Sequence, residues 1–258
     1  ELLPLHWAVG VVTACFVLDN LLFALGMARS TYVARICEKP EDITPSIYTG
    51  LAINHVASIA YGVLGGVISA LNCVCSRGDK VLIHSPTYIG FTKSLKNNGY
   101  EAVHSPLVKD ENGVWRMDFA DMEKHLKEEH IHAAILCNPH NPCGRVWERW
   151  ELEKAMELYK KYDVYVISDE IWSDIILSGH KHTPTQSVSE DARMRTAAFY
   201  APSKTFNLAG LVGSYHIVYN DWWRDRILKE SSLNHYNMMN VLSMHCLLYT
   251  SDAADDKA

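Results

Sequence analysis

Short apolar segments with the length of buried strands alternate along this chain with segments of helical spacing. The strand-like segments are residues 80–84, 101–105, 133–137, 164–168, 196–200 and 214–219. The helical segments are residues 62–71, 91–98, 118–129 and 149–162. Such alternation is typical of a parallel or mixed sheet with helices on both faces. The sequence therefore predicts an α/β fold with three layers and a mostly parallel mixed sheet.

Polar clusters follow four of the predicted strands. They are residues 85–88 (Ser-Pro-Thr-Tyr), 138–141 (Asn-Pro-His-Asn), 169–170 (Asp-Glu) and 201–204 (Ala-Pro-Ser-Lys). In open α/β sheets, ligands bind beyond the carboxyl ends of the strands. We therefore expect these four clusters to meet at one edge of the sheet and to form the functional site.

The composition excludes several other classes of protein. The chain has 258 residues, which allows one large domain or two modest ones. Its 24 basic and 30 acidic residues give a net charge of −6, which disfavours binding to nucleic acid. Seven scattered cysteines indicate reduced thiols in a cytoplasmic protein rather than a disulfide framework. The pair Cys73 and Cys75 lacks a second pair, and the histidines lack ligand spacing, so no metal site is predicted.

Three residues and one helix start could together hold a cofactor. Lys204 lies among small and apolar residues, a setting that lowers the pKa of an amine as Schiff-base chemistry requires. Asp169 could hold a proton on a pyridine nitrogen such as that of pyridoxal phosphate, and Asn141 could donate its amide to a phenolate oxygen. Each also has an ordinary alternative, as a surface lysine, a helix N-cap and a turn residue. Backbone N–H groups at a helix start could bind phosphate, here at Gly62, Val63 and Leu64.

Four ordered motifs resemble the pyridoxal-phosphate-dependent enzymes of fold type I, the aminotransferase class I/II family. They are residues 85–88, 138–147 (Asn-Pro-His-Asn-Pro-Cys-Gly-Arg-Val-Trp), 168–172 (Ser-Asp-Glu-Ile-Trp) and 203–210 (Ser-Lys-Thr-Phe-Asn-Leu-Ala-Gly). The motifs are most similar to the cystathionine β-lyase branch, the MalY/PatB type of carbon–sulfur lyase. The resemblance covers about residues 61–243 and implies the large domain of this fold.

The resemblance also implies a role for each motif residue. Lys204 would carry pyridoxal phosphate as a Schiff base and later move the substrate Cα proton. Asp169 would pair with the pyridine nitrogen, and Asn141 would bond the phenolic oxygen. Tyr88 would stack on the cofactor ring, and Trp172 would lie beside its phenolic oxygen. The phosphate would be held by Ser203 and by the backbone of Gly62, Val63 and Leu64.

The implied reaction is β-elimination from L-cystathionine or a related cysteine thioether, which releases a thiol, pyruvate and ammonia. Trp172 stands where aminotransferases often carry a tyrosine, and residues 211–213 lack the arginine that many of them use for phosphate. Both departures favour the lyase. An aminotransferase and a non-catalytic regulator on the same fold remain the alternatives. The family also implies a homodimer.

Residues 57–245 are expected to be an incomplete cofactor-binding large domain, with the smaller C-terminal domain and its substrate-carboxylate arginine missing. Residues 1–56 match no family motif and could be non-native. Their apolar run 7–27 is long enough to span a bilayer, but Asp19 and Asn20 interrupt it, so no membrane association is expected. Residues 246–258 look like a translated adapter, or else a short polar tail. A chain truncated in this way is expected to bind substrate poorly.

Overall fold

The computed structural model describes residues 64–177, 179–206, 213–233 and 244–245. All of them belong to the second of two compact units, Ala57–Ala258. The apolar run 7–27, the segment 1–56, the tail 246–258 and the predicted phosphate contacts Gly62 and Val63 lie outside the described residues. No helix within the described ranges is long and apolar enough to cross a membrane.

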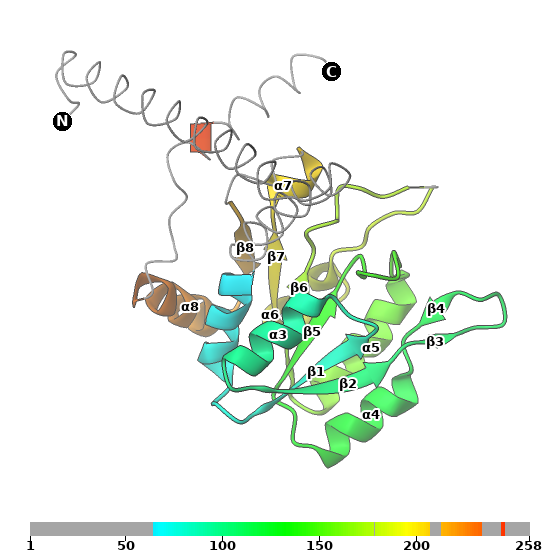
Figure 1. Cartoon of the computed structure of the whole chain (residues 1–258), viewed down its shortest axis with the longest axis horizontal. Helices are drawn as coiled ribbons and strands as arrows, with labels where there is room; N and C mark the ends of the chain where they lie inside the picture. The colour runs from blue at the N-terminus through cyan, green and yellow to red at the C-terminus, as the bar shows by residue number, and fades with distance from the viewer. Residues whose placement is uncertain (1–63, 178, 207–212, 234–243, 246–258) are drawn as a thin grey trace, which may run out of the picture. The chain divides into compact units, whose positions relative to one another are not determined.

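A six-stranded mixed sheet forms the centre of the described unit (Figure 1). Its spatial order is β2-β1-β5-β6-β7-β8. The first five of these strands run parallel, and β8 pairs antiparallel with β7. The strands are β1 (Lys80–Ser85), β2 (Glu101–Pro106), β5 (Ala133–Cys137), β6 (Tyr165–Asp169), β7 (Thr196–Tyr200) and β8 (Tyr215–Val218). The predicted mostly parallel mixed sheet is confirmed.

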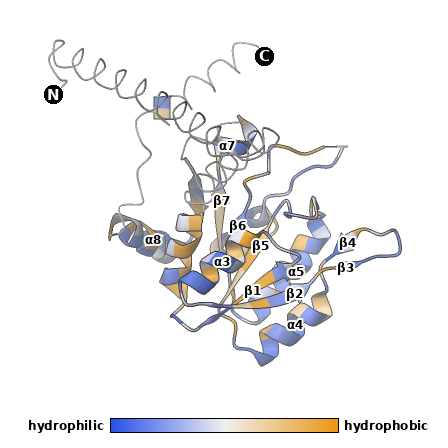
Figure 2. Ribbon diagram, viewed as in Figure 1, coloured by the Kyte–Doolittle hydropathy of each residue, from blue (hydrophilic) through white to orange (hydrophobic). Residues whose placement is uncertain are grey.

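Helices cover both faces of this sheet. Alternate residues of one strand point to opposite faces, so Val81 and Ile83 join one hydrophobic cluster while Leu82 joins the other. The first cluster is closed by the helix of residues 64–74, by α3 (Ile89–Asn97) and by α8 (Asp221–Leu233). The second is closed by α4 (Phe119–Glu128), α5 (Arg149–Lys161) and α6 (Glu190–Arg195). Figure 2 shows β1 and β5 as hydrophobic and much of α4 and α5 as hydrophilic on the outside.

The helix bounds follow from capping and from the spacing of apolar residues. In α4 the side chain of Asp118 accepts hydrogen bonds from the backbone N–H groups of Ala120 and Asp121. Met122 and Leu126, four residues apart, are the buried positions of this helix. The predicted helix 118–129 therefore differs from α4 only by its two capping residues.

Five smaller elements and α8 were not predicted. The strands β3 (Val108–Lys109) and β4 (Trp115–Arg116) form a two-residue antiparallel ladder. The 3₁₀ turn η2 (Thr185–Ser187), α6 and the four-residue helix α7 (Pro202–Thr205) are too short for a periodic signal. In α8 only Trp223, Ile227 and Ser231 are buried, so its apolar face is narrow.

Candidate active site

The four polar clusters do follow neighbouring strands at the carboxyl edge of the sheet. The clusters come after β1, β5, β6 and β7, which are adjacent in the sheet and parallel. The backbone between them is joined by hydrogen bonds, because Asn138 N donates to Asp169 O at 2.9 Å and Glu170 N donates to Phe199 O at 2.8 Å. The expectation that they meet at one edge is confirmed.

Asp169 is the last residue of β6 and is only 8% exposed. Its Oδ1 accepts one hydrogen bond, from Ile171 N at 3.1 Å. The pKa of Asp169 is raised to about 6, mainly by burial and in addition by the charge of Glu170, while the hydrogen bond from Ile171 N and the charge of Lys204 act in the opposite direction. This carboxylate thus lacks a strong cationic partner among the described residues.

Lys204 lies in α7, directly after β7. Its Nζ is 4.9 Å from the centroid of the Trp172 ring, a cation–π distance. Burial lowers the pKa of Lys204, and the charge of Asp169 raises it. Within the described ranges the Lys204 amine forms no ion pair or hydrogen bond, which leaves it available for a reaction.

Tyr88 belongs to the same neighbourhood. Burial raises the pKa of Tyr88, and the charge of Asp169 contributes to the same shift. The ring packs edge-on against Phe91, with 5.5 Å between centroids. A Cβ on Gly90 would lie 2.3 Å from Tyr88 Cε1, so the ring occupies space that only glycine leaves open at position 90. The structure therefore brings Tyr88, Asp169, Trp172 and Lys204 together.

Asn141 reaches the site through the turn after β5. Its backbone N–H donates to Cys137 Sγ at 3.4 Å, and Cys137 lies opposite Asp169 in the β5–β6 register. The side-chain amide of Asn141 makes no hydrogen bond to another described residue. His140 Nε2 donates to Pro86 O at 2.8 Å, which joins this turn to the segment that carries Tyr88.

Of the predicted phosphate contacts, only Leu64 and Ser203 lie within the described residues. Ser203 is buried, and its hydroxyl makes no hydrogen bond to another described residue. Leu64 is half-buried and packs against the first hydrophobic cluster. In the part of the chain that the structure describes, no group of three or more His, Cys, Asp or Glu residues could hold a metal ion.

From the sequence, Glu170 was placed in a polar cluster without an assigned role, and the residues that Glu170 binds were missed. Glu170, directly after Asp169, is fully buried and bonds His182 and Tyr200. His182 has a structural role, because its Nε2 donates to Glu170 Oε2 at 2.9 Å. A glutamate directly after a buried strand was the available signal, because such a residue is rarely buried without partners.

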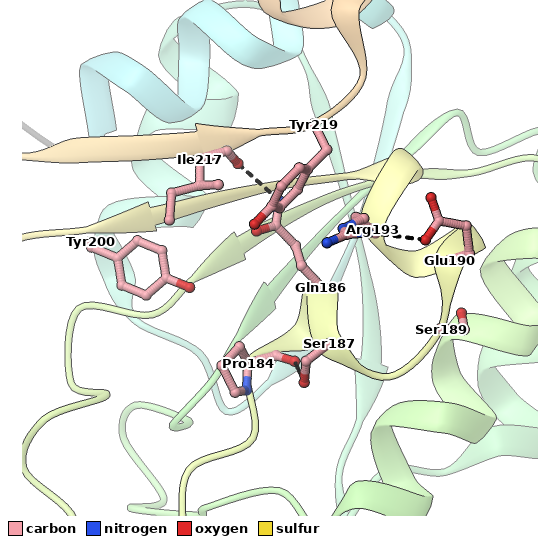
Figure 3. Close-up of a pocket in the computed structure, with 9 residues that line it drawn as sticks. All are labelled: Pro184, Gln186, Ser187, Ser189, Glu190, Arg193, Tyr200, Ile217 and Tyr219. Atoms are coloured by element: carbon pink, nitrogen blue, oxygen red, sulfur yellow. Dashed lines mark hydrogen bonds and ion pairs between the residues drawn. The ribbon is translucent and has the colours of Figure 1, made fainter.

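A pocket of about 580 Å³ lies beside β7 and β8 (Figure 3). Its lining residues are Pro184, Gln186, Ser187, Ser189, Glu190, Arg193, Tyr200, Ile217 and Tyr219. None of these was predicted to bind cofactor. Arg193 pairs with Glu190 at 3.2 Å and lies over the Tyr219 ring, so its charge is already matched within the pocket wall.

Comparisons with known proteins agree with this geometry. The family described as "Aminotransferase class I and II" matches residues 50–255. The cystathionine β-lyase PatB of Bacillus subtilis is 42% identical over 157 residues, which are 61% of this chain and 40% of PatB. The chain thus spans well under half the length of that curated relative.

Two solved structures are also similar. A putative aminotransferase from Clostridium difficile, described as PLP-bound, is 40% identical with a TM-score of 0.68, over 70% of this chain and 46% of that chain. Cystalysin from Treponema denticola, described as containing pyridoxal 5′-phosphate, is 36% identical with a TM-score of 0.67, over the same 70% and 46%. The fold type I architecture and the resemblance drawn from the motifs are confirmed.

Proposed function

The chain belongs to the aminotransferase class I and II family, and we propose that it is the cofactor-binding part of a pyridoxal-phosphate-dependent carbon–sulfur β-lyase. The proposed substrates are L-cystathionine or related cysteine thioethers, and the products are a thiol, pyruvate and ammonia. One observation carries this proposal: Asp169 and Lys204 follow neighbouring parallel strands, and each alters the pKa of the other. The similarity to the cystathionine β-lyase PatB supports the lyase branch.

The donor set fits pyridoxal phosphate. A protonated pyridine nitrogen would supply the cationic N–H partner that buried Asp169 lacks among the described residues. Lys204 offers an amine with a lowered pKa and no competing ion pair in the described part. The amide of Asn141 and the hydroxyl of Ser203 are both without a partner among the described residues.

Each side chain has a proposed task in the elimination. Pyridoxal phosphate, when bound, acts as an electron sink for the pair of electrons left at the substrate Cα. Asp169 keeps the ring nitrogen protonated, and Asn141 orients the phenolic oxygen. Lys204 anchors the cofactor until the substrate amine displaces it, and the freed Nζ then takes the Cα proton before the sulfur leaves Cβ as a thiolate. Tyr88 stacks on the ring.

The remaining assignments complete the proposal. Trp172 lines the site beside Lys204 Nζ, and Ser203 with the backbone of residues 62–64 binds the phosphate. Residues 57–245 form the cofactor-binding large domain. The proposed assembly is a homodimer. The proposed location is the cytoplasm, which the free state of the four cysteines in the described residues supports.

An aminotransferase is the second candidate. The similarity to the putative aminotransferase from Clostridium difficile favours it, since that chain is 40% identical. The two reactions differ in their acceptor: a lyase releases pyruvate from a cysteine thioether without any keto acid, whereas an aminotransferase needs a keto acid to complete its cycle.

Borohydride trapping tests the cofactor assignment. The chain is incubated with pyridoxal phosphate, reduced and digested, and the modified peptide is mapped. We expect modification at Lys204 and its loss in Lys204→Ala, while Lys181→Ala, a change of an exposed lysine, retains it. Modification elsewhere, or none in a folded sample, contradicts the proposal.

A pyruvate assay then separates the candidate functions. L-cystathionine is supplied with and without a keto acid. Pyruvate without a keto acid supports the lyase, and turnover only with a keto acid supports the aminotransferase. Cofactor trapped at Lys204 with no turnover of either kind in a chain extended to the length of its relatives would favour a non-catalytic regulator.

A further inference from the structure

Glu170 is a fully buried carboxylate at the carboxyl edge of the sheet. Its Oε1 accepts hydrogen bonds from Ser168 Oγ at 2.9 Å and Thr185 N at 3.0 Å. Its Oε2 accepts from His182 Nε2 at 2.9 Å and Tyr200 Oη at 2.8 Å. Four donors therefore converge on one carboxylate, and they come from β6, the loop after it, η2 and the end of β7.

The donors satisfy the carboxylate in its ionised form. An ionised carboxylate only accepts hydrogen bonds, and one of these partners, the Thr185 backbone N–H, can only donate. Hydrogen bonds to a charged acceptor are about twice as strong as neutral ones. A buried charge of this kind holds its partners firmly, because losing one of them is costly.

A second chain of hydrogen bonds extends this cluster to β5. Asn138 Nδ2 donates to Thr185 Oγ1 at 3.2 Å. Thr185 Oγ1 in turn lies 2.9 Å from Ser168 Oγ, and Ser168 Oγ donates to Glu170. Asn138 is itself fully buried and also donates to Thr183 O at 3.0 Å. The Glu170 cluster thus consists of Glu170 with Asn138, Ser168, His182, Thr185 and Tyr200.

The cluster ties together the three strands that carry the proposed polar site. Asn138 stands three residues before Asn141, Glu170 stands one after Asp169, and Tyr200 stands four before Lys204. Each of these three cluster members directly follows or ends its strand, β5, β6 or β7. A displacement of Glu170 would therefore move the strand ends relative to one another.

We propose that Glu170 is a positioning residue that fixes Asp169, Lys204 and Asn141 relative to one another by joining the ends of their three strands. The inference rests on the proposed function, since positioning has meaning only if these residues hold pyridoxal phosphate. Glu170 acts through Tyr200 and through the Thr185–Asn138 link rather than by touching the cofactor.

The test compares Glu170→Gln with two other variants. Glu170→Gln keeps the size of the side chain but removes its charge and turns one acceptor into a donor. Tyr200→Phe removes a single hydrogen bond and is the milder change. Tyr100→Phe is the matched control: Tyr100 is buried, its Oη donates to Asn72 Oδ1 at 2.6 Å, and it directly precedes β2, at the amino edge of the sheet.

Three quantities are measured on the full chain: the Kd for pyridoxal phosphate, the circular dichroism of the bound cofactor, and the Tm without cofactor. We expect Glu170→Gln to raise the Kd about tenfold and to weaken the cofactor signal at saturation. Tyr200→Phe should also raise the Kd and weaken the cofactor signal, but by less than Glu170→Gln. Tyr100→Phe should lower the Tm while leaving the Kd within about twofold of the wild type, because Tyr100 shares no hydrogen-bond partner with the Glu170 cluster.

The measurements distinguish a failure of this inference from a failure of the proposed function. If Glu170→Gln lowers the Tm but leaves the Kd and the cofactor signal as in Tyr100→Phe, Glu170 is merely structural and the inference is overturned while the proposed function stands. If the wild-type chain binds no pyridoxal phosphate at Lys204, both are overturned. If Glu170→Gln does not fold, Tyr200→Phe decides, and an unchanged cofactor signal in that variant overturns the inference.

Discussion

Asp169 and Lys204 each oppose the effect that burial has on the other. Burial raises the pKa of Asp169 to about 6, and the positive charge of Lys204 lowers it. Burial lowers the pKa of Lys204, and the negative charge of Asp169 raises it. Burial thus favours the neutral amine of Lys204, the form that acts as a nucleophile and base, and Asp169 limits this effect; Lys204 in turn favours the ionised form of Asp169, which can bind a cationic partner.

Removing the Asp169 charge should lower the pKa of Lys204 further. In Asp169→Asn the only cause that raises this pKa is lost, so burial acts alone. The measurement is the pH dependence of Lys204 acetylation without cofactor, followed by mass spectrometry, and its midpoint should move to lower pH. Asp174→Asn is the control, since Asp174 bonds Thr205 and does not affect the pKa of Lys204. An unmoved midpoint in Asp169→Asn would show that the two groups are not coupled.

The stability of the cofactor-free chain should fall as the pH rises through the pKa of Asp169. The folded pKa of about 6 lies above the ordinary 3.8, so the folded state binds the proton more tightly. This contribution is present below pH 4, is lost progressively up to about pH 6, and amounts to at most about 3 kcal/mol. Urea unfolding at pH 4.5 and 7.5 measures it, and Asp169→Asn should show a smaller loss between these two pH values. Equal losses in both proteins would contradict the prediction.

The bounds of the strands were predicted closely because the apolar pattern that indicates a buried strand lies within the strand's own residues. Buried parallel strands read as continuous apolar runs, and β5 and β7 have the predicted bounds. The order of polar residues after these strands was likewise visible, and the rule for sheet edges placed Asp169 and Lys204 together. The pairing of β8 antiparallel to β7 was not visible, since strand direction depends on the connection between them.

The support of the site could not be predicted because it is built from distant residues. Glu170 and Tyr200 are 30 positions apart, and Asn138 and Thr185 are 47 apart. In each pair, the sequence around one residue gives no indication of the other. The same is true of Gly90, whose role depends on where the Tyr88 ring lies and not on a positive φ.

Gly90→Ala should weaken cofactor binding without destabilising the fold. The new Cβ would meet Tyr88 Cε1 at 2.3 Å, so the ring must swing away, while alanine in α3 favours the helix by about 0.5–1 kcal/mol. Loss of ring stacking raises the Kd for pyridoxal phosphate by about tenfold. Tyr88→Ala should give a similar Kd and Tyr88→Phe a Kd near the wild type. A Kd in Gly90→Ala that matches Tyr88→Phe instead would show that the ring is not displaced.

The ion pair of Arg145 with Glu151 should stabilise the turn that carries Asn141. Glu151 is fully buried, and its Oε2 accepts from Arg145 Nη2 at 2.5 Å, while Arg145 Nε donates to Trp115 O at 2.8 Å. Glu151→Ala leaves Arg145 without its buried partner and should cost about 3–5 kcal/mol in urea unfolding. The control is Glu153→Ala, which breaks an exposed pair on the same helix and should cost less than about 1 kcal/mol.

Because Arg145 closes the turn through the bridge to His140, Glu151→Ala should also raise the Kd for pyridoxal phosphate, and Glu153→Ala should not. Equal losses of stability in the two variants would show that burial of the Arg145–Glu151 pair does not increase its contribution to the free energy of unfolding.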